Sequence, residues 1–295
     1  MGTQKAVEFK NVIKRFPGFE LYIDSLSLER GSITGLVGPN GAGKSTMIKM
    51  IMNLVHPDRG KITVLGRDCR EREQEVKNLV GYVPEECRVY EEVTPDWTGQ
   101  FVSHYYSSWD HGYFHALLQK FNLPGNKKVK ELSKGNKMKL SLSLALAHKP
   151  ELLLLDEPTS GLDPLVRHDL LQELMEVIQT ESRSVLLSSH IIGDIEKVAD
   201  YVGFLRQGSV VLDDDKESIL ERFKRVQFKL TETGQEDIVK DYFIQYNIKG
   251  SYFQGVTGEY SMEWFQELQR MDINSIQVLP LTLEEVMVAL SREVV

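Results

Sequence analysis

The chain has 295 residues, of which 41% are hydrophobic and 26% are charged, a composition typical of a globular protein that can bury a sizeable core. Its formal net charge of −8 disfavours a nucleic-acid partner, because phosphate backbones attract basic faces. No apolar run reaches the roughly 20 residues that a membrane-spanning helix needs, and residues 1–10 lack a signal-peptide stretch, so we expect a cytoplasmic protein.

Short apolar strands alternate with helices along the first two thirds of the chain. Residues 33–37 form an apolar strand that leads into the glycine-rich segment 38–43, and residues 46–54 have the apolar spacing of a helix. Further apolar strands are expected at 152–155 and 185–187, each followed by polar residues. This pattern indicates an α/β fold with a mainly parallel sheet that is covered on both faces.

Two regions depart from this alternation. Helical spacing from Thr94 onward predicts an inserted helical subdomain over about residues 86–150. The composition changes again after residue 215, which predicts a nucleotide-binding domain over 1–215 and an accessory domain over 216–295.

The accessory domain has its own predicted order of strands and helices. A strand, a helix over Glu236–Tyr246, a strand, a turn at Gly255–Gly258, a helix and a strand follow one another, which suggests a small ferredoxin-like α+β fold. A last helix over Leu283–Leu290 is expected to dock its apolar face on the rest of this domain.

The glycine-rich segment fits the phosphate-loop pattern G-x-x-x-x-G-K-[ST]. Glycines let backbone N–H groups curl around an anion, and the following helix adds its N-terminal dipole. Lys44 would reach the β- and γ-phosphates of ATP, and the Ser45 hydroxyl would ligate Mg²⁺. The alternative is a strand-to-helix turn with a solvated lysine, which the complete pattern disfavours. The expected nucleotide-binding residues of this segment are Gly38, Pro39, Asn40, Gly41, Ala42, Gly43, Lys44, Ser45 and Thr46.

Polar side chains follow the two later strands where ligands of such sheets bind. Asp156 would hold Mg²⁺, largely through water, and Glu157 would orient and deprotonate the attacking water. His190 directly follows another apolar strand and could hydrogen-bond the γ-phosphate. Two solvated acids and a structural histidine are the simpler interpretation, but the phosphate loop favours the catalytic one.

The order of these motifs resembles that of the ATPase family of ATP-binding cassette (ABC) transporters, over about residues 5–215. The resemblance implies the P-loop ABC core, with an N-terminal antiparallel β subdomain and a helical insert, and a dimer that holds two ATP molecules between its chains. Leu132–Asn136 stands where the family has its signature motif. In the family this motif acts on the ATP of the opposite subunit, and the implied residues here are Ser133, Lys134, Gly135 and Asn136. Asp163 belongs to a segment, Ser160–Asp163, that resembles the one crossing the dimer interface.

Four positions need separate comment within this resemblance. Phe16 stands about where the family stacks an aromatic ring on adenine, although an ordinary apolar residue in a strand is nearly as good an interpretation. Glu85 occupies the place of a glutamine that touches Mg²⁺, and Lys134 and Asn136 replace the signature glycine and glutamine. Lys134 either binds a phosphate or faces solvent.

Some features resemble a narrower group, the ATPases of bacterial ABC-2-type exporters such as YtrB-, BcrA- and PmtA-like subunits. Trp109-Asp110, the Leu-Ser-Lys-Gly signature and Leu283–Val286 carry this likeness. It implies an ATP- and Mg²⁺-dependent ATPase, a homodimer or heterodimer, that powers an integral membrane permease from the inner face of the cell membrane. An aromatic set could grip that permease or form the core of the helical subdomain: Tyr90, Trp97, Tyr105, Tyr106 and Trp109.

Two other functions compete with an exporter subunit. A soluble ABC ATPase could act on ribosomes, DNA ends or an assembly scaffold, but translation factors of the family carry two cassettes and this chain has one. A nucleotide sensor without turnover is the other, and the presence of both Glu157 and His190 disfavours it.

Overall fold

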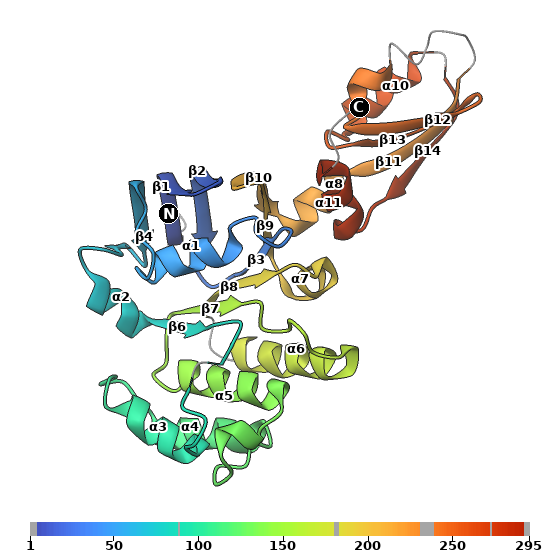
Figure 1. Ribbon diagram of the computed structural model, residues 1–295. Coiled ribbons are helices and arrows are strands. Elements are labelled where there is room, and N and C mark those ends of the chain that lie inside the picture. Colours follow the sequence, from blue (N-terminus) through green and yellow to red (C-terminus); the bar gives the residue numbers. More distant parts are fainter. Residues whose placement is uncertain (1–4, 88, 180–182, 231–238, 272, 292–295) are drawn as a thin grey trace. The chain divides into compact units, whose positions relative to one another are not determined.

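The structure is a computed structural model that describes residues 5–87, 89–179, 183–230, 239–271 and 273–291. The chain forms two compact units, residues 1–213 and 214–295 (Figure 1). The division into functional domains at residue 215 stays a prediction.

A large mixed sheet forms the centre of the first unit. Over the described residues, ten strands lie in the order β5-β4-β1-β2-β10-β9-β3-β8-β7-β6. They are β1 (Lys5–Phe16), β2 (Phe19–Glu29), β3 (Ile33–Val37), β4 (Arg59–Val64), β5 (Arg67–Asp68), β6 (Val80–Val83), β7 (Leu152–Asp156), β8 (Ser184–Ser189), β9 (Tyr201–Arg206) and β10 (Ser209–Asp215). β1 pairs antiparallel with β2 and β4, whereas β3 is parallel to β8 and β9, and β7 is parallel to β6 and β8. The predicted α/β class is confirmed, with its antiparallel N-terminal part and its parallel part.

The central parallel strands read as continuous apolar runs because helices cover both of their faces. Every residue of β3, β7 and β8 is buried. The helices of this unit are α1 (Lys44–Ile51), α2 (Glu73–Leu79), α3 (Pro95–Ser103), α4 (His111–Lys120), α5 (Lys134–Leu146), α6 (Pro164–Gln179) and α7 (Ile192–Val198), with a 3₁₀ turn at Val129–Glu131. Figure 1 shows α3, α4 and α5 together at one end of this unit, and their assignment to a separate helical subdomain stays a prediction.

Side-chain caps fix where the helices of this subdomain begin. The Thr94 hydroxyl accepts a hydrogen bond from the N–H of Trp97 and so starts α3, and the Asp110 carboxylate does the same for α4. Ser133 caps α5 in the same way. Each cap lies just before an apolar helical repeat, so the local sequence determines these three starts.

The predicted aromatic set divides between surface and interior. Tyr90 and Tyr105 are each 68% exposed and Trp97 is 47% exposed. Tyr106, in contrast, stacks on the buried His148 with 4.1 Å between ring centroids, and Trp109 packs on buried Phe114 at 5.4 Å. The set therefore contains both surface and core residues.

A four-stranded antiparallel sheet forms the centre of the second unit. Its order is β12-β13-β11-β14, and an aromatic cluster that includes Phe228 stacked on Phe253 at 4.6 Å packs on one face. The elements are α8 (Lys216–Arg222), β11 (Lys224–Lys229), a 3₁₀ turn (Lys240–Tyr242), β12 (Gln245–Lys249), β13 (Tyr252–Thr257), α10 (Met262–Gln269), β14 (Asn274–Pro280) and α11 (Leu283–Ser291). The ferredoxin-like assignment stays a prediction.

Two local predictions for this unit are wrong in part. Of the expected helix Glu236–Tyr246, residues 236–238 lie outside the described residues. Val239 is helical and Lys240–Tyr242 forms a 3₁₀ turn, but Gln245 and Tyr246 belong to β12, so the helix was expected to extend too far. Pairing of β12 with β13 stacks Tyr246 on Phe253 at 5.5 Å, and this tertiary contact overrides the local helical pattern. Gly255 belongs to β13 rather than to a turn, because its missing side chain makes room for Phe243: a Cβ there would lie 2.5 Å from that ring.

The buried His148 makes the stability of the first unit depend on pH. Burial lowers the pKa of His148 to about 4, so the folded chain holds a neutral imidazole over a range in which the unfolded chain binds a proton. We expect the free energy of unfolding to fall by about 3 kcal/mol as the pH drops from 7 to 4 on account of this group. His148→Phe keeps a ring against Tyr106 but cannot bind a proton. In denaturant titrations of this variant, the free energy of unfolding should therefore differ less between pH 7 and pH 4 than in the unmodified chain, by about 3 kcal/mol. An unchanged difference between the two pH values would contradict the prediction.

Candidate nucleotide-binding and catalytic site

The glycine-rich loop closes tightly between β3 and α1. Gly43, directly before α1, has φ +112°, a conformation that side-chain-bearing residues rarely adopt. Gly38 lies so close to the neighbouring chain that a Cβ on it would be 2.4 Å from the carbonyl oxygen of Leu205. The loop therefore needs glycine at both positions, and its backbone lies at the start of a helix, where anions bind.

Lys44 is held inside this loop. Its residue is 5% exposed, and its Nζ donates to the carbonyl oxygens of Gly38 at 2.7 Å and of Pro39 at 3.3 Å. The same Nζ lies 3.1 Å from Oε1 of Glu157. A cation that is already desolvated and oriented in this way is well placed to bind phosphate oxygens.

Asp156 lies at the end of β7 and accepts two hydroxyl hydrogen bonds. Its Oδ1 is 2.9 Å from Oγ of Ser45 and 2.8 Å from Oγ of Ser188, in the adjacent strand β8. Burial raises the pKa of Asp156 above its ordinary value, against the lowering effect of the two hydroxyl donors.

Oxygen atoms of this kind fit Mg²⁺. The Ser45 hydroxyl and the Asp156 carboxylate are hard oxygen donors next to each other, and Glu85 lines the same pocket. Among the described residues no group of three His, Cys, Asp or Glu side chains could hold a metal ion by itself. Ser45, Asp156 and Glu85 are thus the residues that could contribute oxygen ligands to a magnesium ion, which stays a prediction.

Glu157 and His190 form a second polar pair in the pocket. Oε2 of Glu157 is 2.7 Å from Nδ1 of His190 and accepts a hydrogen bond from its backbone N–H at 3.2 Å. The backbone of Glu157 has φ +49°, and its N–H donates to the Ser188 hydroxyl at 3.0 Å. A carboxylate held by an imidazole on one side and by an ammonium on the other is suited to act as a general base with a fixed orientation.

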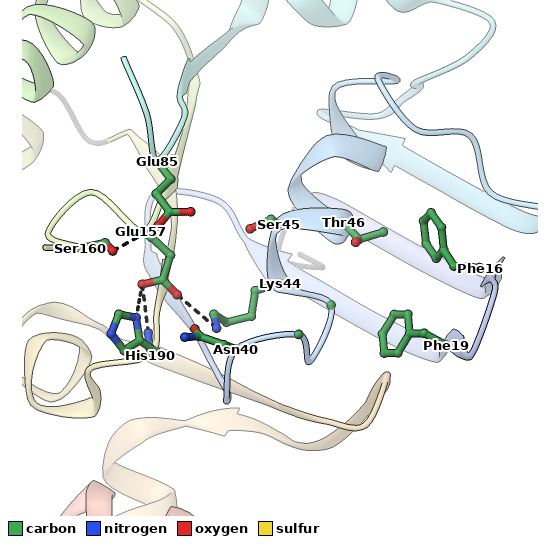
Figure 2. Close-up of a pocket in the computed structure, with 12 residues that line it drawn as sticks. Phe16, Phe19, Asn40, Lys44, Ser45, Thr46, Glu85, Glu157, Ser160 and His190 are labelled. Atoms are coloured by element: carbon green, nitrogen blue, oxygen red, sulfur yellow. Dashed lines mark hydrogen bonds and ion pairs between the residues drawn. The ribbon is translucent and has the colours of Figure 1, made fainter. Parts of the chain in front are cut away.

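These groups line one cavity of about 550 Å³. Figure 2 shows Glu157 between Lys44 and His190, and the rings of Phe16 and Phe19 on the far side of the loop. The lining residues are Phe16, Phe19, Asn40, Gly41, Gly43, Lys44, Ser45, Thr46, Glu85, Glu157, Ser160 and His190.

Two residues that line the pocket were not predicted from the sequence to do so. Phe19 pairs directly with Phe16 across the β1–β2 turn, and the ring centroids are 6.3 Å apart. Hairpin pairing around Gly18 was the signal that could have identified it. Ser160 had been placed only in the interface segment, but its hydroxyl donates to Oε1 of Glu85 at 3.1 Å.

The signature segment does not line the pocket of its own chain. Ser133 is exposed, and its Oγ accepts the N–H of Asn136 at 3.2 Å. Lys134 is exposed and does not line the pocket of its own chain, and its ammonium lies near Gly161, where an added Cβ would be 2.6 Å from Nζ. Asp163 caps α6, because its Oδ1 accepts the N–H of Val166 at 3.1 Å.

Comparison with known proteins gives one consistent result. Residues 22–160 match the sequence pattern of the protein family described as ABC transporter. The ABC transporter ATP-binding protein YtrB of Bacillus subtilis is 31% identical over 288 residues, covering 96% of this chain and 97% of that protein. The Nod factor export ATP-binding protein I of Burkholderia lata is 34% identical over 226 residues, covering 73% and 72%.

Solved structures agree in fold. An ATP-binding subunit of an ABC transporter is 30% identical with a TM-score of 0.65, covering 72% of this chain and 91% of that one. A dimeric ATP-binding cassette in a post-hydrolysis state, bound to ADP and Pi, has a TM-score of 0.62 over 71% and 98% of the two chains. It is 22% identical, and this likeness shows the fold alone.

The position of Glu157 leads to a direct test of its role. Glu157→Gln keeps the shape of the side chain but removes the base, so ATP turnover should fall by about 10²-fold or more while ATP still binds. Phosphate release and nucleotide binding, measured side by side, check this. Glu151→Gln makes the same chemical change just before β7, at its opposite end, and should leave turnover unchanged. Turnover at the original rate in Glu157→Gln would remove Glu157 from this role.

Proposed function

Because the chain belongs to the ATP-binding subunits of ABC transporters, we propose that it powers a membrane exporter through ATP-driven closure and reopening of a pair of such chains. It is an ATPase of this family, and the observation that carries the proposal is the pocket in which Lys44, Ser45 and Glu157 meet at the glycine loop, with Asp156 hydrogen-bonded to Ser45.

The chemistry proposed for the pocket assigns one role to each group. Backbone N–H groups of Gly38–Thr46 and the Lys44 ammonium bind the phosphates, and Lys44 exchanges its contact with Glu157 for phosphate oxygens. Ser45, Asp156 and Glu85 hold Mg²⁺, which, when bound, neutralises charge that develops on the phosphates.

Glu157 takes the proton of the attacking water, and His190 keeps its carboxylate oriented and faces the γ-phosphate. Phe16, together with Phe19, offers an aromatic surface for adenine at the open side of the loop.

Pairing of two chains would complete the pocket. Ser133 is exposed in its own chain and is absent from the lining of its own pocket, which supports its action on a neighbour's ATP. The dimeric cassette of the same fold, bound to ADP and Pi, is consistent with this arrangement. We propose that Ser133, Lys134, Gly135 and Asn136 act in this way, with Asp163 near the interface. The partner is a second copy or a related subunit.

We propose that the membrane-spanning part of the transporter is a permease on a separate chain. Among the described residues, no helix is long and apolar enough to span a bilayer. One relative is by its name an export ATP-binding protein, which supports an exporter rather than an ATPase of ribosomes or scaffolds. The chain would then work at the inner face of the cell membrane.

An exposed aromatic surface is available for that permease. We define it by Tyr90, Trp97, Phe101 and Tyr105. Trp97 stacks on Phe101 with 5.2 Å between centroids, and each of the four rings is at least 39% exposed. Exposed aromatic rings that gather in this way are typical of protein interfaces.

A mixture of two defective chains tests whether the pocket is shared. Ser133→Asp keeps a good helix cap but places a negative charge where the neighbour's phosphates would lie, and Lys44→Ala removes the phosphate cation. Each variant alone should lose ATP turnover, because both of its shared sites are defective. A mixture forms pairs with one intact site, so turnover should return to up to about a quarter of that of the unmodified chain. A mixture no more active than the two variants separately would contradict sites shared between two copies of this chain.

The aromatic surface gives a second test. Trp97→Ser with Phe101→Ser should abolish co-purification with an integral membrane protein while ATP binding is retained, because both rings lie outside the pocket. Leu54→Ser, at a residue that is 55% exposed elsewhere on this unit, is the matched control and should co-purify normally. Co-sedimentation of the unmodified chain with ribosomes instead of membranes would favour the competing function.

A further inference from the structure

One buried carboxylate outside the pocket joins three segments of the nucleotide site. Asp194 is 2% exposed and lies in the first turn of α7. Its Oδ2 accepts a hydrogen bond from the Thr159 hydroxyl at 2.8 Å, and its Oδ1 lies 3.4 Å from Nε of Arg167. None of these three residues lines the pocket.

Each of these three residues belongs to a segment that has a proposed role in the function. Asp194 is in the helix that begins directly after the His190 loop. Thr159 stands between the proposed base Glu157 and the interface segment Ser160–Asp163. Arg167 is in the first turn of α6, and its N–H donates to the carbonyl oxygen of Asp163 at 2.9 Å.

The contacts of Asp194 are directional and buried. A carboxylate removed from water costs several kcal/mol unless charges and hydrogen bonds compensate it, and Thr159 is itself only 2% exposed. A shift of α7 therefore cannot leave Thr159 and Arg167 behind without exposing or unpairing this charge. The two segments that flank the interface loop are thus tied to the helix that follows His190.

We propose that Asp194 is a positioning residue that couples the His190–Glu157 pair to the interface segment Ser160–Asp163. When nucleotide changes the position of His190, Asp194 carries the displacement to Thr159 and Arg167, and so to the neighbouring chain's site. This inference rests on the proposed pairing of chains. The residue does not line the pocket and acts through its two partners.

The test compares Asp194→Asn with Thr159→Val in the full chain. Asp194→Asn removes the charge that faces Arg167, Thr159→Val removes the hydroxyl that donates to Asp194, and neither changes side-chain volume much. The turnover number should fall by about tenfold or more, because small misplacements of catalytic groups are costly. ATP affinity of the chain, measured by titration, and KM should stay within about twofold, because the pocket lining is untouched. A merely structural contact would not separate these two quantities.

A double variant and a control make the result specific. Asp194→Asn combined with Thr159→Val should lose less than the product of the two single effects, because both changes act on contacts of the same carboxylate. Glu173→Gln breaks the Lys139–Glu173 ion pair, which is 2.7 Å long and ties α5 to α6 without touching the site. It should leave the turnover number unchanged.

Separate outcomes bear on the inference and on the proposed function. Unmodified turnover in folded Asp194→Asn and Thr159→Val chains, or an equal loss in Glu173→Gln, overturns the role of Asp194. If Asp194→Asn does not fold, the uncharged Thr159→Val variant decides alone. Absence of ATP turnover in the unmodified chain would instead overturn the proposed function.

Discussion

The carboxylate of Glu157 contacts the Lys44 ammonium with one oxygen and the His190 imidazole with the other, and the arrangement of the pocket depends on these two contacts. A buried carboxylate is stable only where charges and donors compensate its lost hydration. Glu157 lies near both Lys44 and His190 because it directly follows β7, which ends beside β8 with Asp156 opposite Ser188. The order of the parallel strands therefore brings the glycine-rich loop, Glu157 and His190 together.

Much of this arrangement could be predicted because its signals are local. The phosphate loop needs glycines, a lysine and a hydroxyl at fixed spacing, and apolar runs such as Leu152–Leu155 predict buried strands wherever they occur. Parallel strands place their carboxyl ends at one edge, so Asp156 and Glu157 could be expected near Lys44. The roles of these residues in catalysis stay predictions.

Contacts between distant segments could not be predicted in this way. The partners of Asp194 come from two other segments, and the position of the Lys134 ammonium over Gly161 depends on how α5 packs beside the loop before α6. In the second unit, Tyr246 joins a strand because a ring in another strand receives it. Local spacing gives no information about such partners.

The aromatic surface has a consequence for a cell that makes this chain. Tyr90, Trp97, Phe101 and Tyr105 offer rings to water as long as nothing covers them, and uncovered rings of this kind promote self-association. Surplus copies would thus be lost to aggregation or to chaperones and proteases. We expect selection for balanced synthesis of the chain and whatever covers these rings, with their genes expressed together.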